Sequence, residues 1–189
     1  DSSFVLAAYG DSYLYNPRTG LDGIPFLKDV YRPFGFSANG RYFLYLKSVD
    51  RMPTFSLFAY DLIDGTDKPV TTRKVFRAAW SATGEDMAYL TMESASEFTL
   101  YVHDLGAGTS TKVDQGMLDP EWPNWSPDGR QVQYAKLDPK STNYFEDGLL
   151  DRNDYRYDPS SKAIISDGVR PLLEQAADGS NYEVIQPSF

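Results

Sequence analysis

Arginines that stand next to aromatic rings are the residues whose chemistry best suits a binding site in this chain. The arginines are Arg32, Arg77 and Arg170, and the aromatic residues are Tyr31, Phe76 and Trp122. A guanidinium binds a carboxylate through paired hydrogen bonds and stacks on aromatic faces. We therefore expect these residues to bind an acidic or carboxylate-bearing partner. In the alternative interpretation, the arginines are solvated or paired with nearby Asp and Glu.

Side chains for catalysis are scarce. The chain has no cysteine and one histidine, His103. Thiolate nucleophiles, zinc-thiolate sites and multi-histidine metal sites are therefore excluded. The common nucleophile-elbow, zinc-protease and nucleotide-binding motifs do not occur in the sequence. We predict a protein that is not an enzyme, has no cofactor or metal, and uses His103 as a structural residue.

An acidic segment offers a calcium site as an alternative. Asp151, Asn153 and Asp158 carry oxygen ligands, but their spacing does not fit an EF-hand loop, whose twelfth position requires a glutamate and here holds Lys162. Another calcium geometry, with help from residues 146–147, stays open.

The charge balance excludes one class of partner. The chain has 18 Lys and Arg against 27 Asp and Glu, a net charge of -9 and a pI near 4.5. Phosphate backbones and anionic membranes are repelled on average, so we expect no nucleic-acid partner. No window approaches the roughly 20 apolar residues of a membrane span, and no leader precedes the first residues. We expect a soluble chain.

Internal repeats are the elements that must position these residues. The segments FSANGR (36–41), WSATGE (80–85) and WSPDGR (125–130) align without gaps, and a degenerate copy, QAADGS, occupies 175–180. The repeat anchors therefore lie near 37, 81, 126 and 177. A second series, Tyr15, Tyr60, His103 and Tyr157, is spaced by 45, 43 and 54 residues. The third unit thus carries an insertion of about ten residues, which we place at 139–154.

The insertion contains two aromatic residues, Tyr144 and Phe145. Long loops in compact domains often carry function. We expect either a partner-binding loop or a passive excursion.

Each repeat predicts four short strands, which we call strands a to d. A β-rich run follows each turn at 41–47, 86–92 and 131–137, and no stretch predicts a long helix. Four strands in about 44 residues is typical of a propeller blade. We predict an all-β propeller of four-stranded blades as a single domain over 1–189, with about four blades in a closed ring or an arc of a larger propeller. The aromatic residues Phe36, Trp80 and Trp125 should pack between blades.

The third repeat resembles a known family. WSPDGR at 125–130, followed by QVQYAKL and preceded by LYVHDL at 100–105, is similar to the PD40 or TolB-like WD40-type repeat of bacterial β-propellers. The resemblance implies a propeller fold and a periplasmic or extracellular setting. It does not imply one activity, since such blades serve as interaction scaffolds, as domains beside serine peptidases and as substrate-binding platforms.

One face of such a propeller carries the loops that join strand d to the next strand a, here expected at 28–33, 72–77, 114–123 and 166–171. We predict a non-catalytic scaffold that binds a protein through this face. The first alternative is a propeller that gates or binds substrate for a hydrolase on another segment or chain. The second is a carbohydrate or small-ligand binder. The gapless alignment places Arg77 opposite Pro33 rather than Arg32, which disfavours a shared role for the two arginines.

Overall fold

The structure is a computed structural model, and every element that it describes is a β-strand. The backbone is described for residues 4–7, 10–16, 20–21, 27–48, 55–118, 120–137, 152–170, 174–175 and 182–183, and the side chains for 27–48, 55–118, 120–137 and 152–168. The described residues include no helix long and apolar enough to cross a membrane.

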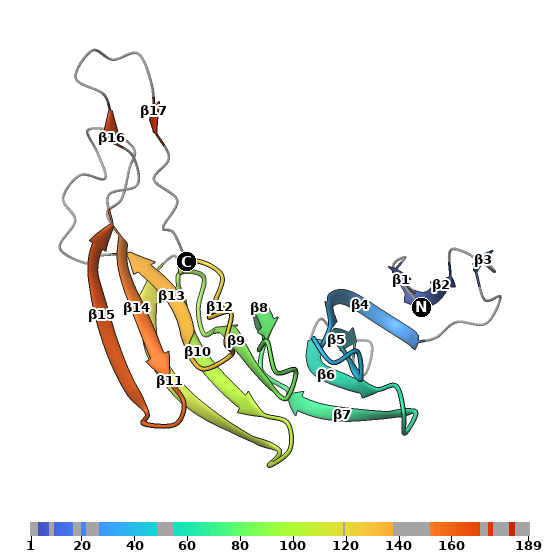
Figure 1. The fold of residues 1–189 in the computed structure, drawn as a ribbon. Helices are drawn as coiled ribbons and strands as arrows, with labels where there is room; N and C mark the ends of the chain where they lie inside the picture. The colour runs from blue at the N-terminus through green and yellow to red at the C-terminus, as the bar shows by residue number, and fades with distance from the viewer. Residues whose placement is uncertain are drawn as a thin grey trace.

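Three antiparallel blades of four strands form the centre of the molecule (Figure 1), and the first of them is part of a seven-stranded sheet. The first blade consists of β4 (Leu27–Phe36), β5 (Tyr42–Ser48), β6 (Phe55–Asp61) and β7 (Thr66–Thr71). The second consists of β8 (Val75–Trp80), β9 (Asp86–Met92), β10 (Glu97–Asp104) and β11 (Thr109–Leu118). The third consists of β12 (Asn124–Trp125), β13 (Val132–Leu137), β14 (Arg152–Asp158) and β15 (Ala163–Arg170).

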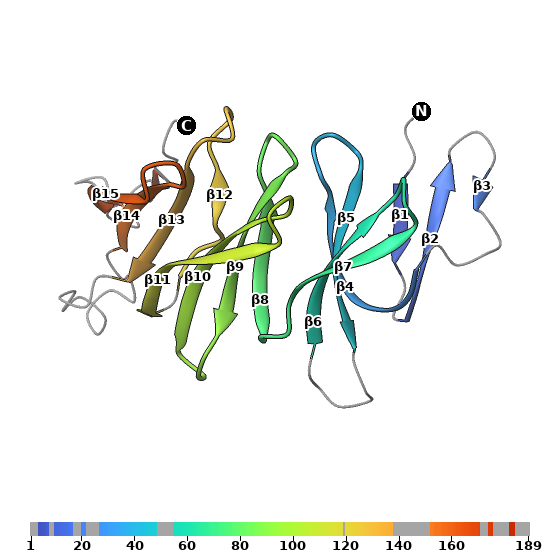
Figure 2. The same cartoon turned by 90° about the horizontal axis from the view of Figure 1, so that it is seen from below.

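The blades form an arc. The first strands of the blades, β4, β8 and β12, follow the concave side of the arc in Figure 1, and Figure 2 shows β7 and β11 in front of them, on the convex side. Before the arc lie β1 (Phe4–Ala7), β2 (Gly10–Asn16) and β3 (Gly20–Leu21), and after it β16 (Glu174–Gln175) and β17 (Tyr182–Glu183). In the described pairings β2 joins β4, whereas β16 and β17 pair only with each other. The terminal strands therefore do not share a blade, and the fold is a propeller arc rather than a closed four-bladed ring.

The prediction of a loop between blades is wrong at two places, because these residues belong to strands. Residues 28–33 lie inside β4, whose first residues pair with β2 and whose later residues pair with β5. Asp29, at this change of partner, has a φ of 59°, in the left-handed region that a short polar side chain tolerates. Residues 166–170 belong to β15. The expected loop at 72–77 shortens to 72–74, and most of 114–123 divides between β11 and the segment before β12.

The repeated Ser-x-x-Gly motif forms the same turn in all three blades. In the first blade, the Ser37 hydroxyl accepts the Tyr42 N–H at 2.9 Å, and Gly40 has a φ of 70°. Ser81 and Ser126 accept the equivalent backbone N–H groups at 3.2 and 3.0 Å. Glycine is required because the last turn position has a left-handed backbone.

Consecutive blades are held together by contacts that recur at the repeat spacing. The indole N–H of Trp80 donates to the Gly35 carbonyl at 3.1 Å, and that of Trp125 donates to the Ala79 carbonyl at 3.2 Å. The turns also stack, because a Cβ at Gly84 would lie 3.1 Å from the backbone nitrogen of Asn39 in the preceding turn.

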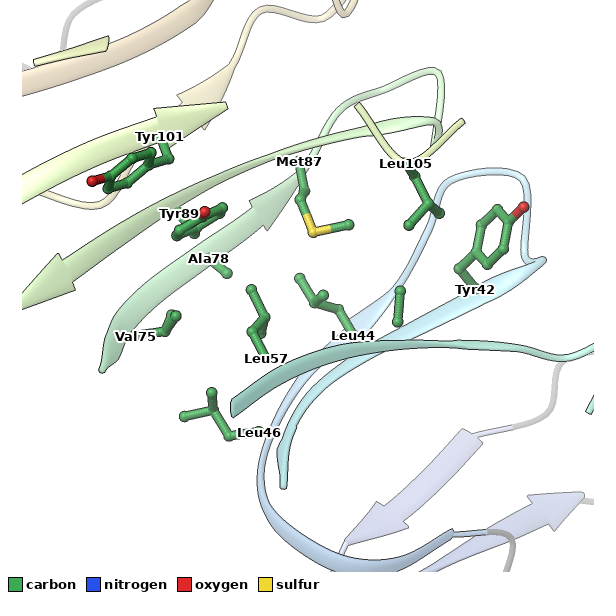
Figure 3. Packing of buried hydrophobic residues seen from close by; sticks show 11 residues of the cluster. Tyr42, Leu44, Leu46, Leu57, Val75, Ala78, Met87, Tyr89, Tyr101 and Leu105 are labelled. Carbon is green, nitrogen blue, oxygen red and sulfur yellow. The ribbon is translucent and has the colours of Figure 1, made fainter. Parts of the chain in front are cut away.

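Apolar side chains fill the space between the blades, as Figure 3 shows for the first and second blades. Leu44 and Leu57 of the first blade and Met87 of the second are fully buried there. Trp80 packs against this cluster, Trp125 against the next cluster and Phe36 against the one on the opposite face of the first blade. The predicted position between blades is confirmed for Trp80 and Trp125. Phe36 packs against residues of its own blade among those that the structure describes.

Candidate functional site

Arg32 and Arg77 occupy equivalent positions on the innermost strands of two neighbouring blades. Arg32 lies opposite Leu46 and Arg77 lies opposite Leu90, and in both strands a register shift directly precedes the arginine. A second shift, between Pro33 and Gly35, is present in β4 alone. This extra residue is the reason why the gapless alignment places Arg77 opposite Pro33, although the two arginines occupy equivalent positions in their strands.

The two guanidinium groups converge on one backbone oxygen. Nη1 of Arg32 donates to the Phe76 carbonyl at 3.3 Å, and Nη1 of Arg77 donates to the same oxygen at 3.3 Å. Arg32 belongs to the first blade and Phe76 to the second, so the pair lies across the junction of two blades on the concave side.

Arg77 also contacts the third blade through an aromatic ring. Its central guanidinium carbon lies 4.1 Å from the centroid of the Phe76 ring and 4.2 Å from that of the Trp122 ring. A cation at this distance from a ring face is attracted by the ring electrons. Trp122 remains 50% exposed, so one side of this arrangement is open to a partner.

The positive charge of the two arginines is not compensated by this part of the chain. Among the described residues, neither arginine has an Asp or Glu oxygen within 4.0 Å. Nε of Arg77 is buried and has no hydrogen-bond partner. Burial and the charge of Arg32 lower the pKa of Arg77 below its ordinary value, although a guanidinium stays protonated at neutral pH. A nearby anion would relieve both the unpaired donor and the repulsion between the two cations.

An aromatic residue precedes each arginine in its strand and packs against a second ring. Tyr31 stacks on Phe55 with ring centroids 3.7 Å apart, and Phe76 packs against Phe98 at 5.1 Å. The residues at the register shifts, Tyr31 and Phe76, are therefore held by partners at the start of strand c. Tyr31 is 46% exposed, so it presents a ring to solvent.

The third blade replaces the aromatic pair with an ion pair. Nε of Arg152 lies 3.6 Å from the Glu121 carboxylate. Four residues of these pairs are not among the site residues predicted from the sequence: Phe55, Phe98, Glu121 and Arg152. The sequence does contain a signal for three of them. Phe55, Phe98 and Arg152 are spaced by 43 and 54 residues, as are Tyr60, His103 and Tyr157.

The remaining predicted site residues do not join this group. Arg170 is the last residue of β15, the fourth strand of its blade, and its backbone pairs with Arg152 on β14. It therefore does not start a strand a as expected, and its side chain lies outside the described residues. Tyr144 and Phe145 also lie outside the described residues. The insertion that contains them does join β13 and β14, as predicted.

His103 lies in the core of the second blade. It is 2% exposed, its Nδ1 is 2.9 Å from the Ser110 hydroxyl, and burial lowers its pKa. Ser110 also accepts a hydrogen bond from the Tyr89 hydroxyl at 3.0 Å. The predicted packing of His103 inside the blade is confirmed.

The proposed calcium ligands are not brought together where they are described. Asn153 and Asp158 lie near opposite ends of β14, about 16 Å apart at the rise of a strand. The Asp158 carboxylate accepts the Ser160 N–H at 2.8 Å. In the described part of the chain, no three His, Cys, Asp or Glu residues are grouped to hold a metal ion. Asp151 and residues 146–147 lie outside it.

Solved structures similar to this chain are propellers. No protein-family model and no curated protein matches the sequence. TolB from Acinetobacter baumannii shares 19% identity and superposes with a TM-score of 0.58 over 89% of this chain and 41% of its own. The putative TolB from Agrobacterium tumefaciens shares 18% identity, with a TM-score of 0.55 over 86% of this chain and 59% of its own.

A protease domain has the same architecture. The β-propeller domain of the Trilobed protease from Pyrococcus furiosus shares 9% identity, with a TM-score of 0.66 over 90% of this chain and 52% of its own. The chain has a TolB-like β-propeller fold. It spans about two fifths to three fifths of the length of these three structures.

Proposed function

We propose that the chain is a non-catalytic interaction module that binds a protein partner on the concave side of the arc. One observation carries the proposal: Arg32 and Arg77 converge across two blades, and half-exposed Trp122 lies against Arg77. Exposed Tyr31 directly precedes Arg32 on the same innermost strand. Arginine, tyrosine and tryptophan are the residues that most often dominate binding energy at protein interfaces. The burial of the single histidine in the core supports a role without catalysis.

A second candidate follows from the likeness to the propeller domain of a protease. In this alternative, the same surface binds substrate for a hydrolase on another segment or chain. The two candidates share the surface and differ in the partner, so one experiment separates them.

The experiment is cross-linked capture with three forms of the full chain, read by mass spectrometry. The forms are the wild type, the double variant Tyr31→Ala and Trp122→Ala, and the control Ile63→Ala, whose side chain is 74% exposed on the turn between β6 and β7. We expect a partner that the double variant loses and the control keeps. Equal retention by all three forms would refute the proposed surface, and recovery of a hydrolase would favour the second candidate.

We also propose a periplasmic or extracellular setting, which rests on the TolB-like fold. Cell fractionation followed by immunoblotting tests it. Detection of the protein in the cytoplasmic fraction alone would contradict this part of the proposal.

A further inference from the structure

We infer that Arg32 and Arg77 form a carboxylate-binding site that receives an acidic group of a partner peptide. The inference rests on the proposed interaction function and names the chemistry that the surface recognises. The first observation that supports it is that the guanidinium groups of Arg32 and Arg77 have few hydrogen-bond acceptors among the described residues. Each guanidinium has five N–H donors, yet both donate to a single peptide carbonyl, each at 3.3 Å.

Other arginines of the same chain show what is missing at this site. Arg41 binds the Asp61 carboxylate through Nε and Nη2, with a shortest distance of 2.8 Å. Arg156 binds Asp167 through the same two atoms at 2.7 Å. Both pairs satisfy the guanidinium with an anion. Arg77 is the more enclosed case, with a buried Nε that has no partner among the described residues, and a buried donor of this kind calls for an acceptor.

The shape of the site favours a planar monoanion. The rings of Phe76 and Trp122 lie 4.1 and 4.2 Å from the central guanidinium carbon of Arg77, which leaves the edge of the group for hydrogen bonds. That edge matches the two oxygens of a carboxylate. The net charge of -9 opposes a phosphate dianion more strongly than it opposes a singly charged carboxylate.

The surroundings also indicate what stands next to the carboxylate. Trp122 is half exposed and in contact with Arg77, so an apolar residue beside the acid can pack on its ring while the acid pairs with the arginines. The ligand is therefore an acidic residue with an apolar neighbour, or a chain-terminal carboxylate that follows one. Both sources supply the same chemical group.

The test is a titration of the full chain with three peptides. The first is capped at both ends and has a Leu-Glu-Leu core, the second has glutamine in place of glutamate, and the third is the glutamine peptide with a free terminal carboxylate. We expect the glutamate peptide to bind at least about tenfold more tightly than its capped glutamine counterpart, as expected for charge-assisted hydrogen bonds. Binding of the third peptide assigns the terminal carboxylate as a source, and its failure assigns the acidic side chain.

Arginine variants locate the binding. Arg77→Met and Arg32→Met should each weaken binding of the glutamate peptide by about tenfold or more. Arg77→Lys should weaken it by less, because lysine keeps the positive charge and lacks only the paired N–H donors of the guanidinium. The matched control is Arg130→Met, since Arg130 is 84% exposed in the turn at the other end of the third blade. Circular dichroism must show the same fold for every variant. In the wild type, the NMR signal of the buried Arg77 Nε–H should shift on binding.

Several results would overturn the inference. They are equal binding of the capped glutamate and glutamine peptides, unchanged binding by Arg77→Met, no binding of either carboxylate peptide, and stronger competition by inorganic phosphate than by acetate. These failures are separate from failure of the proposed function. A captured partner that is lost with the Tyr31 and Trp122 variant but kept by Arg77→Met would retain the interaction surface and remove the carboxylate site.

Discussion

Arg41 stabilises the buried carboxylate of Asp61, and the variant Arg41→Met should therefore lower the free energy of unfolding. Asp61 has no exposed side-chain surface, and Arg41 lies 2.8 Å from it through Nη2. The Arg41 hydrogen bonds hold the pKa of Asp61 well below its usual range. The variant Arg41→Met leaves this carboxylate with Lys68 at 3.4 Å and the backbone N–H groups of Ile63 and Asp64.

The expected loss of unfolding free energy is about 2 to 3 kcal/mol. Removal of one partner from a fully buried ion pair costs about 3 to 5 kcal/mol. The Arg41 side chain is 38% exposed, so solvent screens the pair, and the remaining contacts of Asp61 offset a further part of that loss. For a chain of this size, the melting temperature should fall by about 4 to 12 °C. Urea unfolding at pH 7, followed by circular dichroism, measures the free energy.

The pH dependence provides a second readout. Because the folded-state pKa of Asp61 is depressed, its contribution is complete above the unfolded-state pKa of about 3.9 and is lost as pH falls through the lower folded value. Arg41→Met raises that folded pKa, so stability of the variant should fall less steeply below about pH 4. The curves of wild type and variant should therefore approach each other in acid.

The third blade supplies the control. Arg130 occupies the same turn position as Arg41, is 84% exposed, and has the Asp128 carboxylate 4.0 Å away. Arg130→Met should change the unfolding free energy by less than about 0.5 kcal/mol. If Arg41→Met were as mild as this control, Lys68 and the turn backbone alone would suffice for Asp61, and the reasoning would be refuted.

Three further predictions concern the contacts between blades and the buried histidine. Gly84→Ala should destabilise the fold by about 1 to 2 kcal/mol more than Gly40→Ala in urea unfolding. Both glycines have positive φ, but of the two only Gly84 has a neighbouring turn within 4 Å of the added carbon. Equal losses of unfolding free energy would exclude a role for turn stacking. Trp80→Phe should cost about 1 to 3 kcal/mol, because the Gly35 carbonyl loses its indole donor, and a thermal melt unchanged from wild type would contradict this. Burial holds the pKa of His103 below its ordinary value of 6.5, so the unfolded chain binds more protons there and stability falls as pH drops through that region. His103→Tyr should remove a slope of up to about 1.4 kcal/mol per pH unit below pH 6.5, whereas persistence of that slope would assign it to another group.

Much of the blade could be predicted because its determinants are local. The Ser-x-x-Gly turns recur at fixed spacing, and each is closed by a serine that binds backbone within the same six residues. The structural role of His103 also followed from its place in the tyrosine series. These features depend on neighbours in sequence, so the repeat carries them.

The expected loops failed where pairing extended across a boundary between repeats. Residues 28–33 read as a polar connection, yet they form one strand because β2 and β5 pair with successive parts of it. Hydrogen bonds to distant strands decide this outcome, and a local pattern does not contain them. The same limit applies to Arg170, whose polar segment continues as the end of β15.

The blade, its period and the residue types of a binding site follow from the sequence alone. Which of these residues contact one another depends on strand pairing and on the packing of the blades. Two register shifts in β4, against one in β8, bring Arg32 and Arg77 to equivalent positions, and the packing of neighbouring blades brings Arg32 to the Phe76 carbonyl and Trp122 to Arg77. A strand irregularity adds one residue without a distinctive local sequence, and contacts between blades join residues about 45 positions apart. The meeting of these side chains is therefore a property of the assembled arc.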